Sequence, residues 1–281
     1  MNKNLNIVLF GENIFTNIVL ESLIHSGHHV SLVIAPIYKQ LRDEKLEATC
    51  KVNGIEFARY LNINSEEVVN KVLDTHPDLC VVSNMLKIIK EPLLSIPKMG
   101  FINVHPSLLP YYRGATPEHW PIINGEKKTG ITVHYIDEGT DTGDIIIQKT
   151  IPIGENMYVG ELLNEWGKVL KTIVVEAIEC IVENKGTIKQ SKEEGSYYGK
   201  IKDENRTIVI EEGVQKAYNL IRAFSFPFDG AIYKDVQIFR ANIVAKEAQS
   251  EQIGSFYYDE NDRLLLVFPD GVLEITMSTL E

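Results

Sequence analysis

The chain has 281 residues, of which 44% are hydrophobic and 24% are charged, and its formal net charge is -11. This composition is typical of a water-soluble globular protein with one large domain or two smaller ones, and the acidic balance argues against a general affinity for nucleic acid or anionic membranes. The three scattered cysteines, Cys50, Cys80 and Cys180, offer neither a disulfide framework nor the paired spacing of a metal site. With no apolar run long enough to cross a bilayer and no leader-like start, we expect a cytoplasmic protein without a metal.

Strand-like and helix-like segments alternate through the first two thirds of the chain. The helices are expected over residues 13–26, ended by Gly27, over 64–76, with Asn64 as the cap and Glu67 completing a capping box, and over about 158–183. The strands are expected over residues 6–10, 30–36, 78–83, 100–105, 129–136 and 144–153. Such alternation predicts an α/β fold, an open sheet with helices on both faces.

The pattern changes near Gly195, so we expect a domain over residues 1–195 and a smaller one over 196–281. A polar segment at 196–206 is interpreted as a linker, and residues 213–224 predict a helix. Short strands joined by Asp, Gly and Asn turns are expected over residues 230–234, 236–244, 253–259, 263–268 and 271–277. They predict a small, mainly β domain, a barrel or a curled sheet, whose exposed edges favour a homodimer.

The first strand-to-helix turn, FGENIFTN, has neither the glycine spacing of a dinucleotide site nor the lysine of a nucleoside-triphosphate loop. The sequence therefore disfavours a nicotinamide cofactor or a reaction driven by ATP.

Two polar residues alternate with apolar ones at the end of the strand over 100–105. Asn103 and His105 are two positions apart, so the period of a strand places both side chains on one face. Pro106 ends the strand there, at the carboxyl edge where open α/β sheets bind their ligands. A satisfied Asn–His pair that merely closes the strand is the alternative reading.

A second polar segment follows the strand over 129–136. The stretch DEGTDTGD supplies Asp137, Glu138 and Asp141, and we expect it to return a carboxylate to the same edge of the sheet. An ordinary turn between two strands is the alternative. An amide, an imidazole and a carboxylate suit acyl transfer, because the amide stabilises an oxyanion, the imidazole moves a proton and the acid raises the imidazole pKa. No side chain here is a candidate acyl carrier, so the acyl donor should be a cofactor.

The two segments NVHPSLLPYYRG (103–114) and GITVHYIDEGTDTGDIIIQ (130–148) resemble the signature of the 10-formyltetrahydrofolate-dependent formyltransferase family. General similarity covers about the first 190 residues. The remainder, notably LIRAFSFPFDGA (220–231), resembles the C-terminal domain of methionyl-tRNA and nucleotide-sugar formyltransferases. The resemblance implies a Rossmann-like catalytic domain, a formyltransferase activity, and 10-formyltetrahydrofolate as the donor with tetrahydrofolate as the product.

The same resemblance assigns roles to single positions. It implies that Asn103 stabilises the oxyanion, that His105 acts as general base or acid, and that Asp141 tunes His105. Residues matching the folate-contacting segments are Lys87, Ile88, Ile89, Ser107, Leu108, Leu109, Pro110, Asp137, Glu138, Gly139 and Thr140. His134 and Trp120 are interpreted as structural residues.

The amine that receives the formyl group depends on the branch of the family. Methionyl-tRNA formyltransferases resemble one another in a Gly-rich basic loop after the second strand, whereas residues 35–54 here are shorter and mix cations such as Lys39 and Arg42 with acids. RNA binding requires the neutralisation of many phosphates. We therefore expect a nucleotide-linked amino-deoxy sugar used in surface polysaccharide such as O-antigen, with dTDP-4-amino-4,6-dideoxyglucose as an example and no nucleic acid or membrane partner. Arg113 is expected to bind an anionic substrate group, with a solvated arginine in a turn as the alternative. Tyr198 is expected to stack on the nucleotide base, with packing between the domains as the alternative.

Three alternatives remain open on the sequence alone. A methionyl-tRNA formyltransferase is the first. A formyltetrahydrofolate hydrolase would use the same three residues with water as the acceptor, and a binding protein without catalytic activity would retain them by coincidence.

Overall fold

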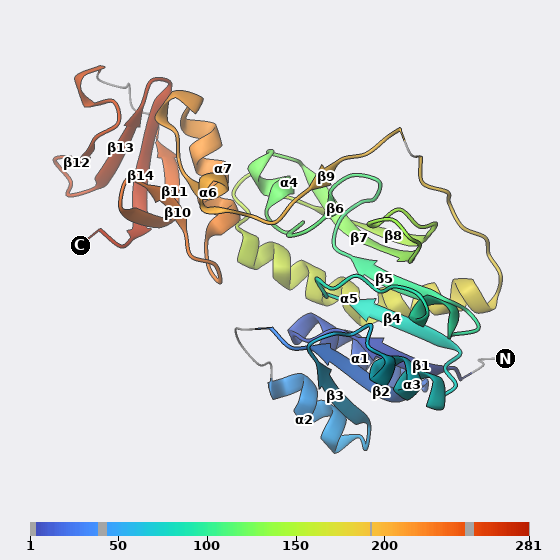
Figure 1. Cartoon of the computed structure of the whole chain (residues 1–281). Coiled ribbons are helices and arrows are strands. Elements are labelled where there is room, and N and C mark those ends of the chain that lie inside the picture. Colours follow the sequence, from blue (N-terminus) through green and yellow to red (C-terminus); the bar gives the residue numbers. More distant parts are fainter. Residues whose placement is uncertain (1–3, 39–43, 192, 245–249, 281) are drawn as a thin grey trace. The chain divides into compact units, whose positions relative to one another are not determined.

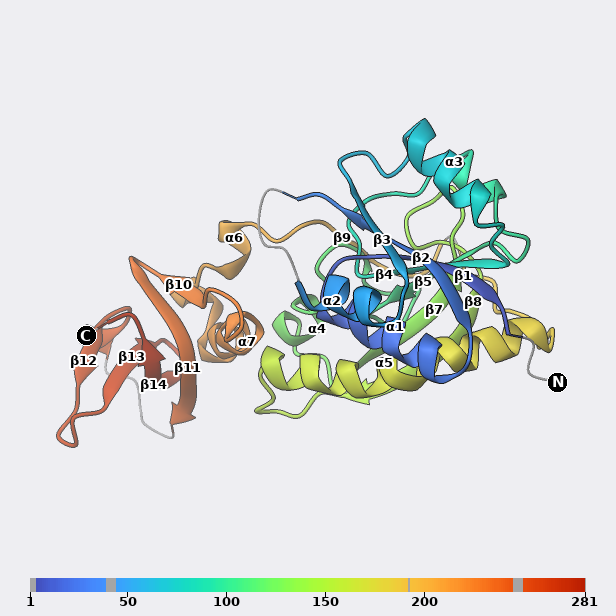
Figure 2. The same ribbon diagram turned by 90° about the horizontal axis from the view of Figure 1, so that it is seen from below.

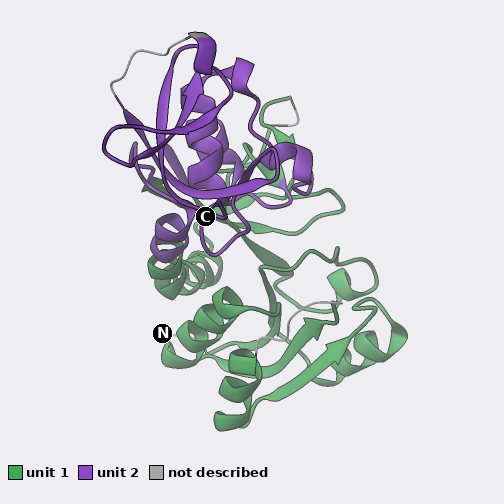
Figure 3. Ribbon diagram, turned by 90° about the vertical axis from the view of Figure 1, so that its left-hand side faces the viewer, with its two compact units in different colours: residues 1–113, 130–151, 166–197 green, residues 114–129, 152–165, 198–281 purple. Residues whose placement is uncertain are grey.

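The computed structural model describes residues 4–38, 44–191, 193–244 and 250–280 (Figure 1). Two compact units share the chain. Unit 1 contains Met1–Arg113, Gly130–Ile151 and Trp166–Tyr197, and unit 2 contains Gly114–Thr129, Pro152–Glu165 and Tyr198–Glu281 (Figure 3). The cations Lys39 and Arg42, which entered the comparison with the tRNA enzymes, lie outside the described residues. A single domain boundary after residue 195 stays a prediction.

Unit 1 is built around a seven-stranded sheet. Its strands, in spatial order, are β3 (Glu56–Tyr60), β2 (His29–Pro36), β1 (Asn6–Phe10), β4 (Leu79–Ser83), β5 (Phe101–His105), β7 (Lys128–Tyr135) and β8 (Ile145–Pro152). The pairs from β3 to β5 are parallel, and β5 pairs with β7 in the antiparallel sense. All five residues of β4 are buried, as expected of a strand covered on both faces. The predicted α/β sheet is confirmed.

Helices cover both faces of this sheet, as predicted. They are α1 (Ile14–His25), α2 (Glu44–Val52), α3 (Glu66–Asp74) and α5 (Val159–Val182). Figure 2 shows α1 and the unit 1 part of α5 along one face and α3 on the other. The apolar side of α3, with Val68 and Val72, packs in one core with Phe10 and Phe101 of the sheet. Among the described residues, no helix combines the length and the apolar character that a bilayer span requires.

The predicted cap of α3 was wrong by one residue. Ser65 is the N-cap, and its hydroxyl accepts a hydrogen bond from the backbone N–H of Val68 at 3.5 Å. Asn64 instead holds the chain beyond β4: its Nδ2 donates to the carbonyl of Ile88 at 2.9 Å, and its Oδ1 accepts from the N–H of Lys90 at 2.9 Å. A cap is the residue whose side chain meets the first free N–H groups, and here the shorter serine does so.

Unit 2 combines α7 (Val214–Phe224) with a five-stranded antiparallel sheet. Its strands, in spatial order, are β10 (Ala231–Tyr233), β11 (Val236–Val244), β14 (Gly271–Ser278), β13 (Leu264–Phe268) and β12 (Phe256–Tyr258). Shorter elements of the chain are β6 (Arg113–Gly114), α4 (Trp120–Ile123), β9 (Tyr197–Tyr198) and α6 (Asp203–Arg206), with 3-10 turns at Leu93–Ser95, Ile210–Glu212 and Ser250–Gln252. The predicted second, mainly β domain is confirmed, and a homodimer through its edges stays a prediction.

Candidate active site

The pairing of β5 with β7 places three polar side chains at one end of the sheet of unit 1. Asn103 lies opposite His134 in the register, and His105 lies opposite Thr132. Opposite residues of an antiparallel pair project to the same face, and so do residues two positions apart on one strand. The two strands therefore present Asn103, His105 and His134 together.

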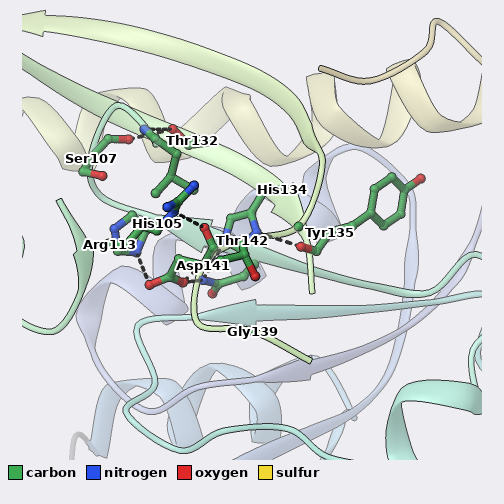
Figure 4. A network of polar contacts seen from close by, with 12 residues as sticks. His105, Ser107, Arg113, Thr132, His134, Tyr135, Gly139, Asp141 and Thr142 are labelled. Atoms are coloured by element: carbon green, nitrogen blue, oxygen red, sulfur yellow. Dashed lines mark hydrogen bonds and ion pairs between the residues drawn. The ribbon is translucent and has the colours of Figure 1, made fainter. Parts of the chain in front are cut away.

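Asp141 joins this group from the loop between β7 and β8. Its Oδ2 lies 3.5 Å from Nδ1 of His105, and its Oδ1 lies 3.3 Å from Nδ2 of Asn103. Oδ1 also lies 3.5 Å from Nε2 of His134. Figure 4 shows His105 and His134 gathered around the Asp141 side chain. The structure thus brings the amide, the imidazole and the carboxylate of the two distant motifs into one cluster, and their catalytic roles stay predictions.

The imidazole of His105 is buried between two acceptors. Its residue is 4% exposed, and its Nε2 lies 2.8 Å from the backbone carbonyl of Tyr112. Since a carbonyl only accepts, Nε2 carries a hydrogen in this arrangement. Burial lowers the pKa of His105, against the opposing effects of the Asp141 carboxylate and the Tyr112 carbonyl. His105 is therefore neutral around pH 7, with Nδ1 facing the acid.

His134 belongs to the same cluster, although the sequence analysis interpreted it as structural. Its Nδ1 lies 2.7 Å from the carbonyl of Tyr135, which requires the hydrogen on Nδ1. In the neutral ring Nε2 is then an acceptor, and Nδ2 of Asn103 lies 3.2 Å from it. The period of β7 gives the face of that strand on which His134 lies, but its position opposite Asn103 depends on the register in which β7 pairs with β5.

The loop that carries Asp141 is shaped by a tight turn. The carboxylate of Asp137 accepts from the N–H of Gly139 at 3.0 Å and from the hydroxyl of Thr142 at 2.6 Å. Asp141 itself has φ of 53°, in the left-handed region. A Cβ on Gly143 would lie 1.9 Å from the carbonyl oxygen of Tyr135, so no side chain fits at that position.

The residues predicted to contact folate separate by burial. Lys87, Ile88 and residues 137–140 are exposed. Ile89, Ser107 and Leu109 are buried, and Leu109 uses both its N–H, to Thr132, and its carbonyl, from Gln148. Leu108, half-buried, packs against Gly130. The buried residues support the site from the protein interior. Direct contact of any of these residues with folate stays a prediction.

The two residues predicted to bind substrate lie in different units. In unit 1, the guanidinium of Arg113 donates to the carbonyls of Asp141 and Ser191 and to the side chain of Gln190. In unit 2, the ring of Tyr198 lies 4.6 Å from that of Trp120, and its hydroxyl accepts from Nδ2 of Asn124 at 3.0 Å. Substrate binding by Arg113 and Tyr198 stays a prediction.

Comparison with known proteins places this geometry in a family. Residues 4–178 match the family described as formyl transferase, and residues 200–281 match the formyl transferase C-terminal domain. The chain is 36% identical over 236 residues to the methionyl-tRNA formyltransferase of Ruminiclostridium cellulolyticum, an alignment that covers 81% of this chain and 75% of that protein.

Solved structures share the fold over the whole chain. One is WlaRD, a sugar 3N-formyl transferase crystallised in the presence of dTDP and 5-N-formyl-THF, with a TM-score of 0.73, 22% identity and coverage of 100% of both chains. Another is the N-formyltransferase from Helicobacter canadensis in complex with folinic acid and dTDP-3-aminofucose, with a TM-score of 0.73, 22% identity and coverage of 97% and 98%. The chain described here belongs to the formyl transferase family.

Proposed function

We propose that this enzyme transfers a formyl group from 10-formyltetrahydrofolate to the amine of a nucleotide-linked amino-deoxy sugar. The observation that carries the proposal is the cluster in which one carboxylate, that of Asp141, faces both His105 and Asn103 within 3.5 Å. These are the three groups that transfer of a formyl unit between two nitrogens requires: an oxyanion donor, a proton carrier and an acid that orients it.

The reaction forms one C–N bond and breaks another. The acceptor amine attacks the formyl carbon, whose oxygen becomes an oxyanion. His105 takes the proton that the amine loses and delivers it to the folate nitrogen as the original C–N bond breaks. The products are the formylated amine and tetrahydrofolate, so no oxidant or further reactant is needed.

Two contacts of the resting site change in this scheme. In the resting tautomer Nε2 of His105 carries the hydrogen. In the reaction this hydrogen is on Nδ1 instead, towards Asp141, so that Nε2 leaves the carbonyl of Tyr112 and accepts the proton of the amine. Both hydrogens on Nδ2 of Asn103 face internal acceptors, His134 and Asp141, so one of them turns to the formyl oxygen during the reaction. The resting hydrogen bonds are 3.2 and 3.3 Å long, at the weak end of the range. Breaking one of them therefore costs little free energy.

The surroundings of the cluster suit a folate. Leu86 and Ile88 follow β4 and leave 57% and 60% of their surface exposed, so both side chains can offer apolar surface to a ligand. The exposed loop 137–140 adds backbone groups near Asp141. A flat pterin is recognised by this combination of apolar walls and backbone hydrogen bonds.

Charge and aromatic content favour a nucleotide-linked sugar as the acceptor. Unit 2 contains the adjacent rings of Trp120 and Tyr198, with Asn124 bonded to the tyrosine hydroxyl. Such a platform can stack one nucleobase, and one diphosphate needs little positive charge on a chain of net charge -11. The sugar formyl transferase structures with the same fold are described with dTDP or a dTDP-amino sugar.

Methionyl-tRNA is the second candidate acceptor. The identity of 36% to the Ruminiclostridium cellulolyticum enzyme favours it. The acidic net charge and the absence of a Gly-rich basic run in the sequence after β2 oppose it, because tRNA binding depends on many phosphate contacts.

A direct comparison of acceptors tests the proposal. The purified protein is supplied with formyl-labelled 10-formyltetrahydrofolate and, in separate reactions, with dTDP-, UDP- and GDP-linked amino sugars, methionyl-tRNA or buffer, and products are identified by mass spectrometry. A labelled nucleotide sugar supports the proposal. Labelled methionyl-tRNA alone would transfer the assignment to the second candidate, and donor cleavage that needs no amine would identify a hydrolase.

A further inference from the structure

The loop that carries Asp141 is held by a side chain from outside both sequence motifs. Gln190 lies just beyond the bridge that pairs Ile188 with Ile145. Its Nε2 donates to the carbonyl of Asp141 at 2.9 Å and to that of Gly143 at 2.7 Å. The two amide hydrogens of Gln190 are thus both used on this one loop.

Arg113 completes the arrangement from another part of the chain. Its Nε and Nη2 donate to Oε1 of Gln190 at 3.2 and 2.8 Å, and Nε also lies 3.2 Å from the carbonyl of Asp141. Its Nη2 further donates to the carbonyl of Ser191 at 3.2 Å. The carbonyl of Asp141 therefore accepts hydrogen bonds from Arg113 and Gln190, and these two side chains are also hydrogen-bonded to each other. We refer to Arg113 and Gln190 together as the clamp.

Asp141 has a backbone conformation that the hydrogen bonds of the clamp can stabilise. A φ of 53° is uncommon for a residue with a side chain, and it persists only where neighbouring contacts maintain it. The same residue directs its carboxylate at His105 and at Asn103. Because the backbone of one residue sets the direction of its side chain, hydrogen bonds to the carbonyl fix the position of the carboxylate.

We propose that Arg113 and Gln190 are positioning residues that hold the Asp141 carboxylate against His105. This inference rests on the proposed function, since it deepens the account of the same site. It also gives Arg113 a different role from the substrate binding that the sequence suggested, because its guanidinium is committed to internal acceptors. Movement of a catalytic group by about 1 Å can cost roughly 100-fold in rate, so a clamp on the backbone of Asp141 matters to turnover.

The test compares variants that alter the clamp in different ways. Gln190→Met keeps the length of the side chain and removes every hydrogen bond. Gln190→Glu keeps an acceptor for Arg113 but loses both donors and sets a carboxylate against two carbonyls. Lys189→Ala, at the exposed neighbouring position, is the matched control. Thermal unfolding of each variant establishes that it is folded. Gln190→Met serves the pKa measurement, and both Gln190 variants serve the kinetic one, because the charge of Gln190→Glu would itself raise the pKa of His105.

The first readout needs no substrate. Proximity of the Asp141 carboxylate raises the pKa of His105, so release of the loop should lower the pKa of His105, measured by NMR of its labelled ring, in Gln190→Met, which adds no charge. Lys189→Ala should leave that pKa unchanged. An unchanged His105 pKa in folded Gln190→Met would overturn the clamp, even if the wild-type protein formylated none of the acceptors supplied and the proposed function failed.

The second readout separates positioning from binding. Loss of the clamp should reduce kcat by up to about 100-fold while KM for both substrates stays within about threefold of wild type. Arg113→Lys retains a cation that can reach one of the acceptors and should recover part of the kcat lost in Arg113→Ala. A rise in KM for the acceptor alone in the Arg113 variants, with kcat unchanged, would overturn the inference and favour substrate binding.

Discussion

His134 and Asp141 are in contact: Nε2 of the imidazole lies 3.5 Å from Oδ1 of the carboxylate. The other oxygen of that carboxylate faces His105, whose ring lies 6.4 Å from that of His134. The carboxylate therefore lies between the two histidines, and Nδ2 of Asn103 donates hydrogen bonds to both the carboxylate and His134. The geometry connects four residues rather than the three of the sequence motif.

His134 should determine which end of the Asn103 amide faces inward. Its neutral tautomer accepts a hydrogen from Nδ2 of Asn103, so His134→Phe should leave that amide without one partner and lower kcat by about 10-fold or more. His134→Gln restores a polar atom near the position of Nε2 and should recover part of the loss. Steady-state kinetics with both variants checks this, and kcat within twofold of wild type for the phenylalanine variant would remove His134 from the site.

The general base or acid role of His105 has its own test. His105→Gln should lower kcat by about 100- to 10,000-fold, because an amide cannot carry the proton. His76→Asn is a suitable control, since His76 is exposed and asparagine tolerates its φ of 48°. Near wild-type turnover of a folded His105→Gln enzyme would refute the proposed mechanism.

The pH dependence of the free energy of unfolding should reveal two buried titrating residues in unit 2, His119 and Glu118. Burial lowers the pKa of His119 to about 4, and the ring is enclosed by Phe224 and Phe228 and bonded to the carbonyl of Ala223. Because its folded pKa lies below the unfolded 6.5, its contribution is present above pH 6.5 and is lost as the pH falls towards 4. The loss amounts to about 3 kcal/mol.

Glu118 acts in the opposite direction. Burial raises its pKa to about 7, so its contribution is present below pH 4.5 and is lost as the pH rises through 7. Its side chain retains 21% exposure and lies 3.7 Å from Nε2 of His119. When the pH falls from 7 to 4.5, the wild type gains the contribution of Glu118 and Glu118→Gln does not. Urea unfolding should therefore show a larger loss of stability over this fall in pH for Glu118→Gln than for wild type. Parallel pH curves for the two proteins would show that Glu118 does not titrate as a buried acid.

Salt dependence distinguishes the two acceptor classes. A protein that neutralises six to ten phosphates loses about 1,000-fold or more in affinity between 50 and 200 mM salt. With a nucleotide-linked sugar, KM should change by less than about 10-fold over that range, since few phosphates are bound. A KM that rises steeply with salt, measured with methionyl-tRNA as the better acceptor, would favour the tRNA enzyme.

The local parts of the fold and of the cluster could be predicted from the sequence. The strand of Asn103 and His105 was visible because the alternation of polar and apolar residues is a property of consecutive positions. Ile14, in contrast, fits the helical period of α1 and is nevertheless 41% exposed, whereas Thr16 and Asn17 are fully buried. Which face of a helix is buried depends on what the sheet presents to it.

His134 and Gln190, which the sequence did not assign to the site, reach it through contacts between segments that are distant in the chain. His134 lies opposite Asn103 only because β5 and β7 pair in the observed register. Gln190 donates a hydrogen bond to the carbonyl of Asp141, 49 positions away in the chain, and the segment around Gln190 matches no motif. Contacts of this kind depend on tertiary structure, so one sequence without its relatives contains no local signal for them.

Additivity of two substitutions tests most directly whether the cluster works as one device. The second-order rate constant for formyl transfer, kcat/KM, is measured for His105→Gln, Asp141→Asn and the double variant. If Asp141 acts through His105, the double variant should be no slower than His105→Gln alone, because the carboxylate then has no ring left to orient. Losses that multiply, so that the double variant falls by the product of the two single effects, would show that the two side chains act independently and would contradict the account.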